Sequence, residues 1–231
     1  MEFTYKLFGT TKEELENFLS TKNVKNTIEL KEDGILVKIF QGEYNANQFD
    51  DINKQFILTF NEYIYAEEDI SLASQLVKIL TVQRQKIAVA ESFTGGNIAG
   101  AITAISGASQ VFHEGIVAYS NSAKISRLKV KEQTIDNFKP VSAQVAYEMA
   151  CGLIMNSPID FAISTTGIAG PNSDDSKFPV GLCYIGIGTE KKINCYKYHF
   201  KGTRQEIVTQ GVKTALFLAI KALRNSYFNI Q

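Results

Sequence analysis

The sequence predicts an α/β protein, namely an α/β/α sandwich with a mixed sheet that is preceded by a small α+β module. Beyond residue 68, apolar strand-like runs alternate with helical patterns, and two strands then follow one another before the last helix. Before residue 68, a hairpin pattern lies between two helical patterns. The chain has 231 residues, enough for two domains, and we place these domains at residues 1–68 and 69–231.

The elements predicted for the first domain are a strand, a helix, a hairpin, a second helix and a short strand. The first helix begins at a capping box, in which the Thr11 hydroxyl accepts from the Glu14 amide and the Glu14 carboxylate reaches back. The hairpin turns at Asp33-Gly34, because glycine tolerates a positive φ. The other predicted bounds are Phe3–Phe8, Thr27–Phe40, Ala46–Tyr63 and Ile64–Ala66.

The second domain shows five helical and five strand-like patterns. Ser142 is the expected N-cap of the helix that follows it. The predicted helices cover Ile70–Arg84, Asn97–Ile105, Ser122–Leu128, Ala143–Met155 and Gln205–Arg224. The predicted strands cover Lys86–Ala90, Gly115–Tyr119, Phe161–Thr165, Val180–Gly188 and Ile193–Phe200.

The composition excludes several classes of protein. Lys+Arg and Asp+Glu are both 24, so the chain lacks the basic excess of a dedicated nucleic-acid binder. No run reaches the roughly 18 apolar residues of a membrane-spanning helix, and the N-terminus lacks the order of a signal peptide. The three cysteines form no CxxC pair and there are only two histidines, so we expect neither a metal nor a cofactor. We expect a cytoplasmic protein.

The most informative segment is Glu91–Gly96, where a strand runs into Ser92 and two glycines lead into a helix. Glycine lets backbone amides approach a ligand closely, and the start of a helix suits an anion or an oxyanion. Ser92 is therefore the best candidate for a nucleophile. The alternative interpretation is a plain strand-to-helix turn in which the hydroxyls act as caps.

Lys124 follows the next predicted strand and lies 32 positions after Ser92, one β-α-β passage away. Neighbouring strand ends in such a sheet can bring the two residues together. A lysine can act as the base for a serine only if burial or positive charge lowers its pKa from about 10.4. The alternative is a solvated lysine on a helix surface.

Two further features lie near strand ends in the same domain. Thr166–Pro171 is a rigid loop with several free amides, or else an ordinary loop. Arg204, before the last helix, could hold a phosphate or a carboxylate, or could be solvated. Because open α/β sheets bind ligands at such ends, the residues predict a small-molecule enzyme, with a Ser/Lys hydrolase as one option.

These loops also resemble a known family. Residues Ala88–Gly96 are similar to the AESCTGG signature of the CinA C-terminal domain family, which includes the nicotinamide-nucleotide amidohydrolases called PncC. The match extends in order across residues 70–225. Its other segments are Phe112–Asn121, Lys124, Val141-Ser142, Thr166–Pro171 and Pro179–Gly181.

The resemblance implies an amidase of pyridine nucleotide recycling that converts nicotinamide mononucleotide to nicotinate mononucleotide and ammonia. The resemblance implies that Ser92 is the nucleophile and Lys124 its base. It also implies that Tyr119 lies near this dyad and that Arg204 contacts the phosphate. The full set of substrate-binding residues that we expect is Glu91, Thr94, Gly95, Gly96, Ser120, Asn121, Thr166, Gly167, Ile168, Ala169, Gly170, Pro171 and Arg204.

Phe93 departs from the family, which usually has cysteine at this position of the signature. Strand alternation points this side chain away from the nucleophile, so we expect altered packing rather than lost catalysis. A narrowed pocket or a changed specificity is the open alternative. Two other functions therefore remain open: a non-catalytic nucleotide-binding protein of regulation or interaction, related to competence or damage, and an amidase for another substrate.

The first domain resembles the middle, KH-like region of CinA proteins, on Phe8-Gly9, the helix after it and the stretch from Tyr65 to Ser92. We expect neither the molybdopterin-binding-like domain of those proteins nor its dinucleotide pyrophosphatase chemistry. Because the GxxG loop of nucleic-acid-binding KH domains is missing, we expect a structural or oligomerising role. The expected partners are a small-molecule nucleotide and a second copy of the chain in a homodimer, with no membrane and no nucleic acid.

Overall fold

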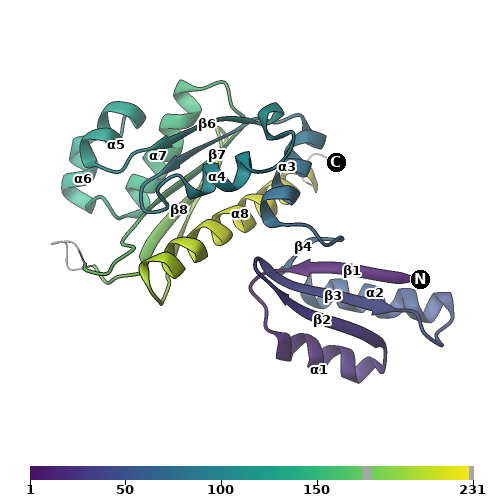
Figure 1. The fold of residues 1–231 in the computed structure, drawn as a ribbon. Coiled ribbons are helices and arrows are strands. Elements are labelled where there is room, and N and C mark those ends of the chain that lie inside the picture. The colour runs from purple at the N-terminus through teal and green to yellow at the C-terminus, as the bar shows by residue number, and fades with distance from the viewer. Residues whose placement is uncertain (174–177, 229–231) are drawn as a thin grey trace. The chain divides into compact units, whose positions relative to one another are not determined.

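The computed structural model describes residues 1–173 and 178–228, so residues 174–177 and 229–231 of the second predicted domain lie outside the described residues. The chain divides into two compact units, Met1–Gln75 and Leu76–Gln231. Each unit contains one sheet, of four strands in the first and five in the second (Figure 1). Within the described part, no helix combines the length and the apolarity that crossing a membrane requires.

The first unit is an antiparallel sheet in the order β2-β3-β1-β4, with two helices packed on it. Alternate residues of β1 and β3 point to one face, where they form a core with the apolar side chains of both helices. The predicted capping box of Thr11 and Glu14 is confirmed. The bounds are β1 (Glu2–Leu7), α1 (Lys12–Lys22), β2 (Lys25–Lys31), β3 (Gly34–Phe40), α2 (Ala46–Phe60) and β4 (Ile64–Ala66).

The predicted hairpin is present, but its loop is one residue earlier than expected. Lys31 pairs with Gly34 in the ladder, so the two loop residues are Glu32 and Asp33. Gly34 still supplies the positive φ, at 143°, as the first residue of β3. The resemblance of this unit to a KH-like region stays a prediction.

The second unit is a mixed sheet in the order β6-β5-β7-β8-β9, which confirms the predicted α/β class. β5 (Ile87–Glu91), β6 (Phe112–Val117) and β7 (Phe161–Gly167) are parallel, whereas β8 (Leu182–Thr189) and β9 (Lys192–His199) continue the sheet antiparallel. Parallel strands end at the same edge of a sheet. The residues that follow β5, β6 and β7 therefore share one edge.

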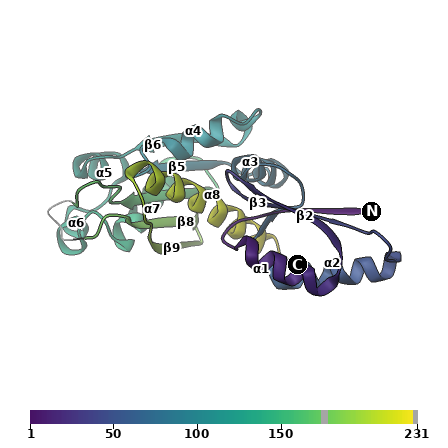
Figure 2. The same ribbon diagram turned by 60° about the horizontal axis from the view of Figure 1, so that its bottom comes forward.

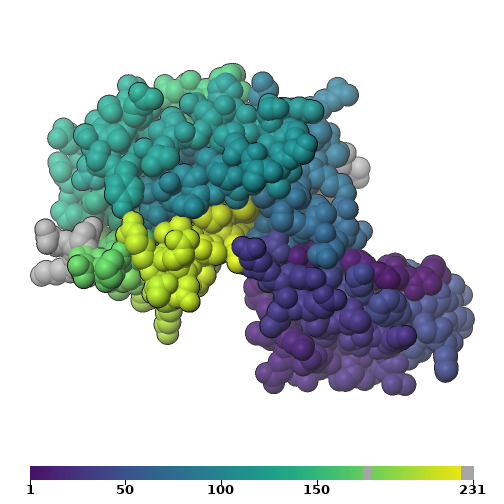
Figure 3. Space-filling view, in the orientation of Figure 1, coloured from purple at the N-terminus to yellow at the C-terminus, as the bar shows by residue number. Residues whose placement is uncertain are grey.

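Helices cover both faces of this sheet (Figures 1 and 2). α7 (Ala143–Asn156) packs on the face to which Ala88, Ala90 and Ala162 point, together with α5 (Asn121–Leu128) and α6 (Glu132–Phe138). α4 (Asn97–Thr103) and α8 (Arg204–Phe228) cover the other face. The first turns of α8 reach the surface of the unit (Figure 3).

Three elements complete the chain, and two of them were missed by the sequence prediction. α3 (Leu72–Gln83) begins in the first unit and ends in the second. The 3-10 turn η1 (Ala108–Gln110) and the helix α6 were not predicted. Both are short, and the N-cap residue of α6, Lys131, gives no side-chain cap, so neither has a strong local start signal.

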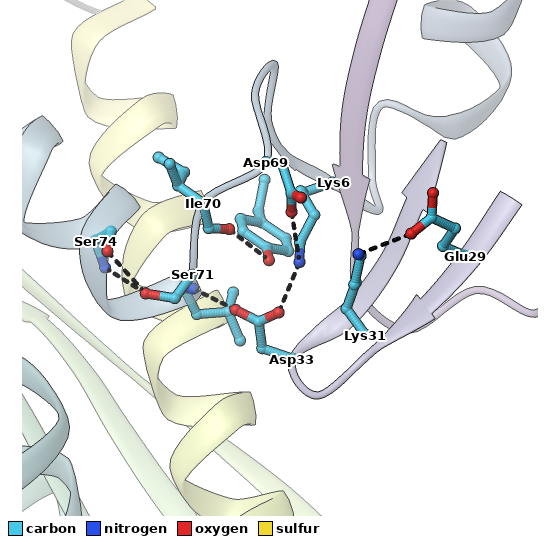
Figure 4. Close-up of polar contacts among 10 residues, drawn as sticks. Lys6, Glu29, Lys31, Asp33, Asp69, Ile70, Ser71 and Ser74 are labelled. Atoms are coloured by element: carbon cyan, nitrogen blue, oxygen red, sulfur yellow. Dashed lines mark hydrogen bonds and ion pairs between the residues drawn. The ribbon is translucent and has the colours of Figure 1, made fainter. Parts of the chain in front are cut away.

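A buried charge cluster lies in the first unit, where the hairpin loop meets the start of α3 (Figure 4). The Lys6 ammonium donates to Asp33 at 2.8 Å and lies 3.5 Å from Asp69. The second oxygen of Asp33 accepts from the amide of Leu72, at 2.9 Å, and so caps α3. Lys6 is only 3% exposed, and a buried ammonium without a partner is costly.

We therefore expect Asp33→Ala to destabilise the protein by about 3 kcal/mol, because it leaves Lys6 short of its nearest carboxylate and uncaps α3. Urea denaturation monitored on the first unit would measure the change. The matched control is Asp50→Ala, which removes an exposed i,i+4 partner of Lys54 and should leave the stability nearly unchanged. Equal losses of stability in the two variants would show that the burial of Lys6 does not increase the contribution of its ion pair to stability.

Candidate active site

Ser92 is the first residue after β5, and the two neighbouring strands of the sheet determine where it lies. Its amide donates to the carbonyl of Thr165 on β7, at 2.9 Å. On the other side, the carbonyl of Glu91 accepts from the amide of Ala118, directly after β6, at 2.8 Å. The serine is thus held by backbone bonds on both sides at the carboxyl end of the parallel strands.

Lys124 comes from the first turn of α5, which follows β6. The hydroxyl of Ser120 caps this helix by accepting from the amide of Ala123, at 3.1 Å. The Lys124 ammonium nitrogen donates to Ser92 Oγ at 2.9 Å, and the two residues are 3% and 7% exposed. The structure therefore brings together the two residues that the sequence placed one β-α-β passage apart.

Burial lowers the pKa of Lys124 to about 8. The physical cause is the loss of hydration, which disfavours the charged ammonium. Among the described residues, Lys124 makes no ion pair that would oppose this effect. A minor fraction of this lysine, far larger than for an ordinary lysine, is therefore neutral near physiological pH and can accept a proton.

Glu91, predicted to bind substrate, instead folds back onto the turn that follows it. Its carboxylate accepts from the amides of Gly96 at 3.0 Å, Ile98 at 3.1 Å and Ala99 at 2.8 Å. The side chain is 1% exposed and does not line the cavity beside Ser92. The structure thus places Glu91 at the helix start and not in the cavity lining, because the first amides of a helix need acceptors and this buried carboxylate supplies them.

This capping also corrects the expectation that amides near Thr94 and Gly95 hold an anion. The Gly95 amide donates to the Ser92 carbonyl at 3.2 Å, and the Gly96 amide is bonded to Glu91. Thr94 is fully buried, with its hydroxyl 2.7 Å from that of Thr165. In the described part of the chain, the amides of Phe93 and Thr94 are the ones in this turn without a hydrogen-bond partner.

A cavity of about 490 Å³ opens beside Ser92 and Lys124. It is formed by the residues after β5, β6 and β7 and by the start of α8. Its lining is Ser92, Phe93, Tyr119, Ser120, Asn121, Lys124, Pro140, Val141, Thr166, Gly167, Ile168, Ala169, Gly170, Asn172, Ser173 and Arg204.

Most of the predicted substrate-binding residues line this cavity, but five do not: Glu91, Thr94, Gly95, Gly96 and Pro171. Sequence reasoning missed Pro140, Val141, Asn172 and Ser173 as lining residues. Pro140 and Val141 approach from the segment before α7, and the Pro140 carbonyl accepts from the Thr166 hydroxyl at 2.7 Å. The Val141-Ser142 motif was the available signal, but it was interpreted only as a helix start.

The charged residues of the lining are both cations, Lys124 and Arg204. Arg204 donates to the carbonyl of Gly170 at 2.6 Å and to the hydroxyl of Tyr119 at 3.0 Å, so it joins two of the loops around the cavity. Tyr119, expected near the dyad, is 62% exposed and contacts Arg204. Among the described lining residues, Arg204 is a permanent cation, Lys124 can be protonated and none is a carboxylate, which favours an anionic ligand.

The fold and the site define an α/β protein with a buried serine–lysine pair at the carboxyl end of its parallel strands. The chain belongs to the CinA C-terminal domain family, whose model matches residues 69–223. This finding confirms the family resemblance of the sequence motifs.

Individual relatives agree with this assignment. The chain is 44% identical to a CinA-like protein of Endomicrobium trichonymphae over 166 residues, covering 71% of this chain and 39% of that protein. It is 36% identical to a CinA-like protein of Fusobacterium nucleatum over 196 residues, covering 84% and 48%. The chain thus spans less than half the length of these curated relatives.

A solved structure shows the same fold. The crystal structure of the competence/damage inducible protein CihA from Agrobacterium tumefaciens superimposes with a TM-score of 0.64 at 37% identity. The match covers 66% of this chain and 93% of that chain. The mixed five-stranded sheet with its flanking helices is therefore the shared part.

We expect Glu91→Gln to destabilise the protein by about 2 kcal/mol, because an amide NH₂ replaces one of the charged acceptor oxygens. The amides of Gly96, Ile98 and Ala99 should then exchange hydrogen faster. Denaturant unfolding and amide exchange would measure both effects. Glu14→Gln is the control, since this carboxylate caps an exposed helix start and its loss should matter less. Unchanged exchange at the three amides would contradict the capping role.

Proposed function

We propose that this chain is an amidohydrolase that converts nicotinamide mononucleotide to nicotinate mononucleotide and ammonia. The observation that supports this most directly is the 2.9 Å hydrogen bond between the buried Lys124 nitrogen and Ser92 Oγ. A serine becomes a nucleophile when an adjacent base can take its proton, and the lowered pKa of Lys124 meets that need. Membership of the CinA C-terminal domain family agrees with this class of reaction.

The proposed reaction has two halves. Neutral Lys124 takes the proton of Ser92 Oγ as this oxygen attacks the carboxamide carbon, and a tetrahedral intermediate forms. Lys124, now an ammonium, gives the proton to the amide nitrogen, the C–N bond breaks, and ammonia leaves an ester on Ser92. Water then loses a proton to Lys124 and attacks the ester, which releases the carboxylate and restores the serine.

The negative oxygen of the tetrahedral intermediate needs hydrogen-bond donors. The amides of Gly95 and Gly96 are occupied within the turn, and Thr94 is fully buried, so we assign this role to the amide of Phe93. Phe93 lines the cavity and directly follows the nucleophile. The expected donor thus shifts toward Ser92 from the glycines that the sequence indicated.

The phosphate of the substrate is proposed to bind Arg204 at the far side of the cavity. Its guanidinium is exposed and carries donors that a phosphate can engage in pairs. Among the residues that the structure describes, none of those lining the cavity is a carboxylate that would repel an anion. Apolar side chains of Val141 and Ile168 offer a surface for the pyridine ring.

The first test follows ammonia release from nicotinamide mononucleotide. We expect Ser92→Ala to reduce turnover to the background rate, because it removes the nucleophile. Lys124→Met, which keeps the length of the side chain but not the base, should lower kcat by about 10²–10⁴-fold. Lys124→Arg should be as poor, since a guanidinium stays protonated.

The matched controls are Ser126→Ala and Lys131→Met, two exposed residues near the same helix, and both should retain full activity. Full activity in Ser92→Ala would rule out the proposed nucleophile. Tight binding of the nucleotide without ammonia release by the unmodified protein would instead support a non-catalytic binding protein. Faster turnover of another amide in a panel would reassign the substrate.

The dependence of kcat/KM on pH provides a second test. Burial places the pKa of Lys124 at about 8, below the ordinary value for lysine, so the neutral base forms as the pH rises through 8. We expect kcat/KM to rise about tenfold per pH unit below this value and to level off above it. A profile that stays flat or falls between pH 6.5 and 9 would exclude neutral Lys124 as the base.

A further inference from the structure

Gly211 lies inside α8, at a position where a side chain would collide with Phe93. A Cβ atom built on Gly211 would lie 2.8 Å from Cε2 of the Phe93 ring, and closer still to Cζ. Real Cβ contacts are almost never this short. The ring, which is 4% exposed, therefore occupies the space that any other residue at 211 would need.

A glycine inside a helix is destabilising by about 0.5–1 kcal/mol relative to alanine, so its position calls for a physical reason. At Gly211 the reason is the aromatic ring. Gly100 in α4 provides the contrast, since a Cβ there would meet nothing within 4 Å. The large side chain at 93 and the missing side chain at 211 thus match each other in size.

This contact joins the nucleophile to the helix that carries Arg204. Phe93 is the neighbour of Ser92, and its turn is held by the Glu91 carboxylate and by the bond from the Ser92 amide to Thr165. Gly211 follows Arg204 by seven residues, which is about two helical turns, so both lie on one face of α8. The separation of α8 from the turn therefore determines how far Arg204 stands from Ser92.

We propose that Phe93 and Gly211 form a size-matched pair that positions Arg204 relative to Ser92. The pair thereby selects amides that bear a phosphate, and this part of the inference rests on the proposed function. Protein interiors are close-packed and transmit strain, so an added methyl group at 211 must move the ring or the helix. The ring is 4% exposed and therefore has little space into which it can turn, and its backbone is held by the bonds of the turn, so in our proposal the helix yields. Arg204 then leaves its contacts with Gly170 and Tyr119.

The test uses Gly211→Ala, Phe93→Cys and the double variant, with nicotinamide mononucleotide and its dephosphorylated riboside as substrates. Gly211→Ala should lower the ratio of kcat/KM for the nucleotide to that for the riboside at least tenfold. The double variant should recover the ratio to within threefold, because the smaller cysteine leaves room for the methyl group. Introducing Gly211→Ala should lower the melting temperature of the unmodified protein, but should raise that of the Phe93→Cys variant.

Gly100→Ala is the matched control, because it adds the same methyl group inside a helix where the space is open. It should leave the nucleotide-to-riboside ratio unchanged. A pair that served stability alone would shift the melting temperature but not this ratio. An unchanged ratio in a folded Gly211→Ala protein would therefore overturn the positioning role.

Crystal structures of the same variants decide the question without a substrate. Gly211→Ala should lose the hydrogen bonds from Arg204 to the Gly170 carbonyl and the Tyr119 hydroxyl, and the double variant should regain them. If the unmodified protein released no ammonia, the proposed function would fail while this readout still tested the positioning. Should Gly211→Ala fail to fold, the Phe93→Cys variant provides the test. We expect its smaller side chain to let α8 move toward the turn, so that Arg204 loses its contacts with Gly170 and Tyr119. Intact Arg204 contacts in the structure of Phe93→Cys would overturn the proposal.

Discussion

The turn after β5 depends on the buried carboxylate of Glu91. Three N–H groups at the start of α4 converge on its two oxygens, which supply the acceptors that the first amides of a helix lack within the helix itself. The turn places Ser92 against the edge of the sheet and directs Phe93 toward α8. The carboxylate of Glu91, which the sequence suggests as a ligand-binding group, thus holds the backbone turn that presents the nucleophile.

The second constraint is the exclusion of water from Lys124. A lysine in solvent would be an ammonium and could not take a proton from a serine, whereas burial disfavours that charge. The hydrogen bond to Ser92 Oγ satisfies the amine without adding a carboxylate that would restore its basicity. The burial that makes the charged form of Lys124 unfavourable is therefore the same feature that lets this residue act as a base. Arg204, at the exposed rim of the cavity, remains the permanent cation.

Helix α8 connects these features, because its first residue lines the cavity while its interior contacts the side chain beside the nucleophile. The signature that the sequence resembles has a cysteine where this chain has Phe93, and the larger ring fills the space beside Gly211. Gly211 compensates for that volume on the opposite element. Under our proposal, specificity depends on a residue outside the lining, Gly211, through its contact with the lining residue Phe93.

Local patterns in the chain were sufficient for the α/β class and for most helices and strands, and they placed Ser92 and Lys124 after neighbouring strands, while the family resemblance suggested that the two residues pair. These features follow from hydrophobic periodicity and from the rule that parallel strands end at one edge of a sheet. The orientation of Glu91, the contact of Tyr119 with Arg204 and the lining role of Pro140 were settled only by tertiary packing. Each depends on groups far apart in the chain that compete for the same buried hydrogen bonds and the same space. A local sequence pattern holds no information about which of these groups makes the contact.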